Sequence, residues 1–139
     1  MSRRIRWVET DASGFVHFAC YVRLMEETEY GFLRSRGLSV VLYDERGTMG
    51  FPRIHTVVEV ERPLTYDQFV KTRLELESID GKQIVYAFII HDETNQVAAS
   101  GRFTVACCRF PDDAPPFAIL TPDSVIDALQ QTTNSGLND

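Results

Sequence analysis

Hydrophobic and polar residues follow two different patterns over the first 40 residues. Charged and apolar residues alternate over residues 3–8, which predicts a short strand. A polar, turn-forming segment follows at residues 9–14. A helix is predicted next, and it should begin at about Phe18. From there mostly apolar side chains recur every three or four residues as one buried stripe: Tyr21, Leu24, Met25, Thr28 and Phe32. The helix should end near Arg36-Gly37, because a cation in the last turn and a glycine just beyond it are typical of helix ends.

Strand patterns dominate the following part of the chain. Asp80-Gly81 favours a hairpin turn, because both residues tolerate positive φ, and residues 92–95 predict another turn. Between these turns and on either side of them lie segments rich in Val, Ile, Phe and Thr. They predict long strands at residues 53–62, 69–79, 82–91 and 96–110.

Two other segments have different patterns. Residues 39–52 contain two glycines and a proline and show no sustained period, so we expect a connection there. Near the end, Thr121 should cap a second, short helix that has Pro122 at its first helical position and ends near Gln131. Residues 132–139 should form a frayed tail.

The order of elements predicts the fold class. A strand, a long helix and about four antiparallel strands in succession are typical of a single α+β domain, here spanning residues 1–139. The wide apolar stripe of the helix must be buried, so we expect an antiparallel sheet wrapped around one long central helix. At least one edge of that sheet must then be protected by charge or covered by another subunit.

Composition narrows the function classes. A chain of 139 residues with 44% hydrophobic and 24% charged residues is ordinary for one globular domain. The net charge of −6 argues against nucleic-acid binding, and the short apolar runs argue against a membrane span. The start of the chain does not resemble an export signal, and three cysteines without a C-x-x-C pair suit a reducing compartment. We therefore expect a cytoplasmic protein.

Asp11 is the first candidate for chemistry. It lies in a turn-forming loop a few residues before the N-terminus of the predicted helix, and that end carries free N–H groups and a partial positive charge. Such an end can stabilise an oxyanion on a carbonyl, while a nearby carboxylate attacks the carbon or activates water. By pattern alone, however, an Asp at this place can equally be a helix cap or an Asx-turn residue.

The segment around Asp11 resembles a known family. Residues 7–26, W-V-E-T-D-A-S-G-F-V-H-F-A-C-Y-V-R-L-M-E, are similar to the signature of the 4-hydroxybenzoyl-CoA thioesterase family, whose members have the hotdog fold. The T-D-A-x-G-x-V portion is the most specific piece. The resemblance continues through R-P-L-T-Y-D-Q at residues 62–68 and the strand lengths down to about Phe110.

The resemblance implies an acyl-CoA thioesterase with Asp11 as the catalytic nucleophile or general base. The backbone N–H of Phe18 would donate to the oxyanion. His17 stands one place before the position at which some bacterial members have a histidine, so it is a further catalytic candidate and, alternatively, a loop or interface side chain. Members of this family build their pockets between subunits, so we expect a homodimer or homotetramer.

Three further residues are substrate-binding candidates. Glu26 falls where the aromatic-acyl members contact the hydroxyl of the ring, and Tyr21 belongs to the same helix. Lys82 lies where the family keeps a basic cluster for the CoA phosphates, although it can also be a plain surface lysine. Glu29 lies inside the apolar stripe, so we expect it to pair with an arginine or to cross a subunit interface.

The remaining reactive side chains show no other active-site motif. The histidines and cysteines lack metal-ligand spacing, and neither a G-x-S-x-G elbow nor a phosphate-binding glycine loop is present. We expect no metal and no organic cofactor, since CoA is part of the substrate. Two alternatives remain: a hydratase or dehydratase in which Asp11 and His17 share a water, and a non-catalytic acyl-binding protein.

Overall fold

The computed structural model describes residues 1–131, and the tail expected at residues 132–139 lies outside them. Its largest layer is an antiparallel sheet of five strands in the order β1-β5-β6-β7-β4. Gly81, at φ 60°, and Asn95, at φ 65°, provide the left-handed residues of the two hairpin turns that join β5, β6 and β7. The strands are β1 (Ser2–Arg4), β4 (Arg53–Val60), β5 (Phe69–Asp80), β6 (Gln83–His91) and β7 (Val97–Ala106).

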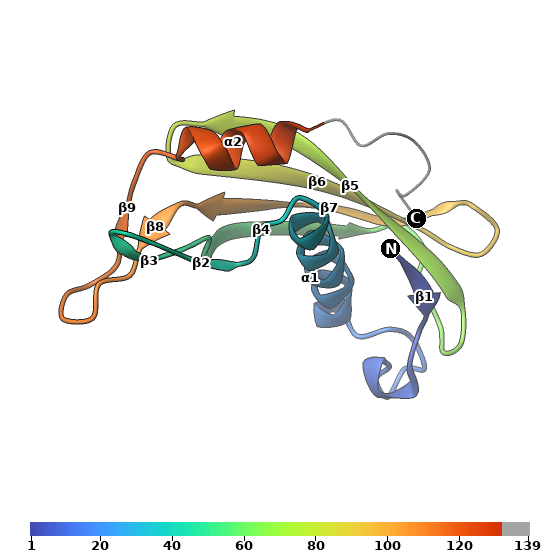
Figure 1. Cartoon of the computed structure of the whole chain (residues 1–139). Helices are drawn as coiled ribbons and strands as arrows, with labels where there is room; N and C mark the ends of the chain where they lie inside the picture. Colours follow the sequence, from blue (N-terminus) through green and yellow to red (C-terminus); the bar gives the residue numbers. More distant parts are fainter. Residues whose placement is uncertain (132–139) are drawn as a thin grey trace.

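Helix α1 (Phe18–Ser35) packs its apolar stripe on this sheet (Figure 1). Leu24 and Met25 are fully buried, and the ring of Phe32 meets the ring of Tyr86 edge to face, with centroids 5.9 Å apart. Met25 packs tightly on Gly101 of β7, where an added Cβ would lie 2.7 Å from Cε of Met25. The predicted helix is thus confirmed, and so is the α+β class with antiparallel strands.

The strand predicted at residues 3–8 is only half correct. Strand β1 ends at Arg4, and Trp7–Glu9 form a 3-10 turn, η1, in which Thr10 N–H donates to the carbonyl of Trp7. Trp7 and Val8 are 73% and 82% exposed, so the alternation in this segment does not mark a buried face. The turn redirects the chain from the sheet toward α1.

The connection expected at residues 39–52 is wrong, because this segment forms a hairpin. Strands β2 (Val41–Asp44) and β3 (Gly47–Gly50) pair with each other, and β3 continues to β8 (Cys108–Arg109) and β9 (Phe117–Ala118) as a second sheet. Gly47 has a φ of 107° at the tight turn, and Gly50 lies directly under the Phe110 ring. The glycines therefore provide a turn and a close contact within strands.

Two boundaries near the C-terminus also differ from the prediction. The strand expected at residues 96–110 is divided, since β7 ends at Ala106 and β8 begins at Cys108. Helix α2 (Asp123–Gln130) packs near β5 and has Pro122 as its N-cap residue. Thr121 does not cap it, because its hydroxyl donates to the carbonyl of Gly81 at 2.9 Å. Within residues 1–131, no helix is long and apolar enough to cross a membrane.

Candidate active site

The loop that carries Asp11 is held in a defined shape. Thr10 and Val16 form a bridge at its base, and Asp11 N–H donates to the carbonyl of Phe15 at 3.0 Å. Gly14 closes the turn at φ 86°, a conformation that favours glycine. Val16 N–H donates to the carbonyl of Leu64 at 2.8 Å, which fixes the loop to the segment before β5. Asp11 is therefore presented from an anchored turn.

The Asp11 carboxylate is exposed and ionised. Its Oδ1 accepts hydrogen bonds from the hydroxyl of Ser13 and, at 2.8 Å, from Ser13 N–H, and these bonds lower the pKa of Asp11. The charge of His17 lowers this pKa further, to a smaller extent. Within residues 1–131, the second oxygen, Oδ2, makes no hydrogen bond. One oxygen is thus fixed, and the other is available to a reactant.

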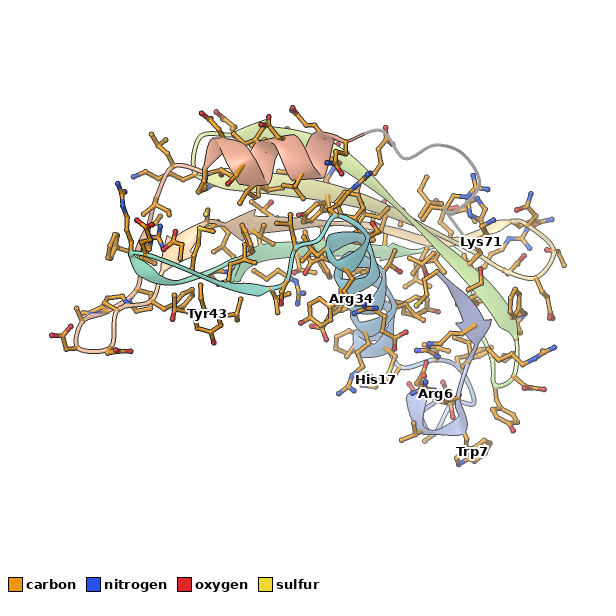
Figure 2. The ribbon with its side chains drawn as sticks, in the orientation of Figure 1. Arg6, Trp7, His17, Arg34, Tyr43 and Lys71 are labelled. Carbon is orange, nitrogen blue, oxygen red and sulfur yellow. The ribbon has the colours of Figure 1, made fainter. Side chains whose placement is uncertain are left out.

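The start of α1 lies next to this loop. His17 is the N-cap residue: its Nδ1 accepts from Ala19 N–H at 3.2 Å, and its backbone N–H donates to the carbonyl of Glu9 at 2.8 Å. Phe18 N–H has no acceptor among residues 1–131, as is usual for the first residue of a helix. His17 and Phe18 stack with ring centroids 4.6 Å apart, and Figure 2 shows His17 at the open end of the helix. A free donor and a free carboxylate oxygen thus come from neighbouring segments.

Exposed apolar side chains surround the same region. The rings of Trp7 and Tyr66 meet edge to face, with centroids 5.6 Å apart. Phe15 bridges to Thr65, and the exposed fractions of Trp7 and Phe18 are both 73%. Clustered exposed aromatic residues mark surfaces that bind a ligand or another chain.

Glu26 and Glu29 of α1 share one arginine, Arg53 of β4. Arg53 donates to Oε2 of Glu26 at 3.1 Å and to Oε1 of Glu29 at 3.2 Å, and its guanidinium lies 4.1 Å from the centre of the Phe103 ring. Glu29 pairs with an arginine as expected; burial raises the pKa of its carboxyl, and Arg53 partly offsets this. Glu26 is the more exposed of the two, with 39% of its side chain accessible.

The structure does not bring the other two substrate-binding candidates to Asp11. Tyr21 lies in the core with 1% exposure, and its hydroxyl accepts from Leu64 N–H at 3.2 Å. Lys82 follows the turn between β5 and β6, at the end of the molecule where the small sheet lies. Trp7 lies near the opposite end of the molecule (Figures 1 and 2). Contacts of Tyr21 and Lys82 with a substrate stay predictions.

A hollow of about 790 Å³ lies between the small sheet and Lys82. Arg46 and Arg109 line it together with Lys82, and Phe117 and Leu120 add exposed apolar surface. Arg109 is held by both oxygens of Asp44 at 2.7 Å, and the charge of Arg46 also acts on Asp44, whereas Lys82 makes no ion pair within residues 1–131. Asp112 is the carboxylate in the lining, so cations are in excess there.

Sequence reasoning missed several residues of these sites. Ser13 holds the Asp11 carboxylate, and its place two residues after an Asp was the available signal of an Asx turn. Arg53, Arg46 and Arg109 come from distant segments, and no spacing in the sequence connects them with Glu26 or Lys82. Among residues 1–131, no group of three His, Cys, Asp or Glu side chains is close enough to hold a metal ion.

Two known proteins are similar to this chain in sequence. A protein of Aquifex aeolicus (strain VF5) that carries a provisional esterase name is 34% identical over 98 residues, which cover 69% of this chain and 74% of that protein. The 1,4-dihydroxy-2-naphthoyl-CoA hydrolase of Picosynechococcus sp. is 24% identical over 107 residues, covering 77% and 73% of the two chains.

A solved structure and a family match complete the comparison. The 1,4-dihydroxy-2-naphthoyl-CoA thioesterase from Synechocystis superposes with a TM-score of 0.79 at 18% identity, covering 93% of each chain, which shows a shared fold. Residues 5–126 match the thioesterase-like superfamily, and this range includes Asp11, α1 and four strands of the large sheet, β4 to β7. The chain therefore belongs to the thioesterase-like superfamily of hotdog proteins.

Proposed function

We propose that this protein is an acyl-CoA thioesterase in which Asp11 is the catalytic carboxylate. The observation that carries the proposal is the presence, on neighbouring segments, of an ionised, exposed Asp11 oxygen and of the unbonded Phe18 N–H at the start of α1. The superfamily match supports thioester chemistry. In the resulting fold, α1 is the central helix on which the sheet closes.

The reaction follows from the charges that develop. Oδ2 of Asp11 attacks the thioester carbonyl carbon, or it accepts a proton from a water that attacks there. Either attack places negative charge on the carbonyl oxygen, and Phe18 N–H and the positive end of α1 stabilise that charge. Collapse of the tetrahedral intermediate breaks the carbon–sulfur bond, and the CoA thiolate leaves and takes up a proton. In the nucleophilic route the acyl group then remains on Oδ2 as a mixed anhydride, and water hydrolyses it to the free acid and regenerates the Asp11 carboxylate. Because thiolate is a good leaving group, the proposal needs no metal ion and no organic cofactor.

His17 has a supporting place in this proposal. Its Nδ1 is occupied by Ala19 N–H, so Nε2 is the nitrogen that can face a substrate. With Nδ1 accepting, Nε2 carries the ring proton and can donate a hydrogen bond to the substrate. This favours a donor role for His17 over the shared-water pair of a hydratase.

We also propose that the protein belongs to the 4-hydroxybenzoyl-CoA thioesterase branch and acts on hydroxyaryl-CoA substrates. Glu26 is partly exposed and has an oxygen, Oε1, outside its bond to Arg53, so it can accept a hydrogen bond from a ring hydroxyl. Tyr21 then supports the site through Leu64, because its hydroxyl holds Leu64 at the base of the Asp11 loop.

The hollow beside Lys82 suits the nucleotide end of CoA. Arg46 and Lys82 offer positive charge to phosphates, and Phe117 offers an apolar surface to the adenine ring. Lys82 and the turn at Trp7 that leads to Asp11 lie toward opposite ends of the folded subunit. We therefore propose that one CoA thioester binds between two subunits and contacts Asp11 of one and Lys82 of the other.

That arrangement requires a homodimer or homotetramer. Strand β4 supports it, since β4 pairs with β7 on one side and has no strand on its other side within residues 1–131. Ile54, Val57 and Val60 on β4 are 53%, 39% and 45% exposed, and an apolar edge strand of this length favours pairing with another chain.

The experiment that tests the function is a thiol-release assay. Purified protein is incubated with hydroxyaryl, short-chain and long-chain acyl-CoAs, and the released CoA thiol is measured. A parallel hydration assay on crotonyl-CoA tests the hydratase alternative. Thiol release that depends on Asp11 supports the proposal; hydration without thiol release, or binding without turnover, would overturn it.

A further inference from the structure

A buried ion-pair network lies directly behind the Asp11 loop. Arg3 of β1 donates from Nη1 to Oε1 of Glu9 at 2.8 Å. The same guanidinium donates from Nε and Nη2 to both oxygens of Glu27 in α1, at 2.8 and 3.0 Å. Only 16% of the Arg3 side chain is exposed, so this is a fork-shaped contact in a partly dry environment.

Glu9 depends on Arg3. Its side chain is 7% exposed, and its second oxygen, Oε2, is buried without a hydrogen-bond partner within residues 1–131. A buried carboxylate without a compensating charge is costly, so Arg3 is what keeps the Glu9 side chain in place. The same residue contacts the helix start through its backbone, because the Glu9 carbonyl accepts the His17 N–H at 2.8 Å.

This network joins the two ends of the loop. Glu9 stands two residues before Asp11, and its carbonyl holds His17 just before the Phe18 donor. Arg3 then ties Glu9 to Glu27, which is more than two helical turns along α1 from Phe18. Within residues 1–131, the loop is also held by its contacts with Leu64 and Thr65, and η1 by the contact of the Trp7 ring with Tyr66.

We propose that Arg3 and Glu9 are positioning residues that set the distance between the Asp11 carboxylate and the Phe18 N–H. This inference rests on the proposed function. Arg3 does not touch the substrate; it acts by fixing η1 on α1, so that the attacking oxygen and the oxyanion donor face one carbonyl group. A displacement of about 1 Å between such groups can cost on the order of a hundredfold in rate.

The diagnostic substitution is Arg3→Lys. Lysine keeps the positive charge but has a single nitrogen, so it cannot hold Glu9 and both oxygens of Glu27 at once. We expect kcat to fall at least about tenfold while KM stays within about twofold. Val125→Ala is the control: it removes buried volume from α2, far from the loop, and lowers the melting temperature without changing kcat.

Amide hydrogen exchange gives a readout that is independent of activity. In Arg3→Lys, exchange at residues 10–18 should become faster than in the wild type, whereas Val125→Ala should leave those residues unchanged. If Arg3→Lys behaves like Val125→Ala in kcat and in exchange, the positioning role is wrong. If exchange rises but the wild type releases no thiol from acyl-CoA, the network is real and the proposed function is what fails.

Discussion

Ser13 binds the Asp11 carboxylate twice, through its hydroxyl and through its backbone N–H at 2.8 Å. Both bonds reach the same oxygen, Oδ1, and both favour the charged form, so the pKa of Asp11 lies below its ordinary value of 3.8. The turn therefore prepares a carboxylate that is ionised at any physiological pH and has one oxygen free. An enzyme that uses this carboxylate as nucleophile or base needs that state.

Replacing Asp11 by Asn should lower kcat at least about a hundredfold, because the amide neither attacks a carbonyl nor accepts a proton from water. The amide has the same size and Asp11 is exposed, so the fold should be unchanged. The measurements are steady-state thiol release and circular dichroism of both proteins. A variant that keeps most of its activity would remove Asp11 from the mechanism.

Ser13→Ala should raise the pH at which activity is lost in acid. The substitution removes the largest cause of the low Asp11 pKa and keeps the backbone bond, so the pKa moves back toward 3.8. Since the carboxylate must be ionised to act, the acid limb of kcat/KM should shift to higher pH in the variant. The check is a pH–rate profile of wild type and variant; coincident limbs would show that another group controls the acid side.

Glu26→Ala should narrow the preference for hydroxyaryl-CoA over a straight-chain acyl-CoA of similar size. A polar partner that the bound substrate covers favours the substrate that can donate to it and rejects the one that leaves it unpaired. The measurement is the ratio of kcat/KM for the two substrates in wild type and variant. An unchanged ratio would mean that Glu26 serves only its ion pair with Arg53.

The native protein should be a dimer or tetramer in solution, and Val57→Lys should weaken that association. Val57 lies on the open edge strand β4, where an added charge opposes pairing with a second chain. Gln96→Lys adds the same charge in the exposed turn between β6 and β7 and is the control. Light scattering of the three proteins is the measurement, and a stable, active wild-type monomer would contradict the proposal.

Two glycine substitutions should have opposite effects on stability. Gly101→Ala places a Cβ 2.5 Å from the carbonyl oxygen of Val57 and 2.7 Å from Cε of Met25, so the free energy of unfolding should fall by about 2 kcal/mol. Gly31→Ala lies within α1 with only a flexible Arg34 side chain nearby, at 3.8 Å, and should raise it by about 1 kcal/mol. Urea denaturation measures both, and equal effects would contradict the packing described for α1 and β7.

Helix α1 and the main strands could be predicted from the sequence, because their patterns involve residues that are close together along the chain. The apolar stripe from Phe18, the cation and glycine at Arg36-Gly37 and the alternating β-branched segments predicted α1 and four main strands, because helix and strand periods depend on neighbouring residues. The resemblance of residues 7–26 led to the superfamily that the match over residues 5–126 shows.

The contacts between strands and side chains that are far apart in sequence could be read from the tertiary structure alone. The glycines of residues 39–52 resembled a connection because turn and contact glycines have the same composition as a loop, and it is the pairing of β3 with β8 that makes the segment a strand. The partners of Glu26 and Glu9 likewise come from other elements, namely Arg53 and Arg3, and Lys82 and Arg46 line one hollow although they are distant in sequence. A side-chain ion pair leaves no periodic trace in the sequence, since its two members are brought together by the packing of separate elements.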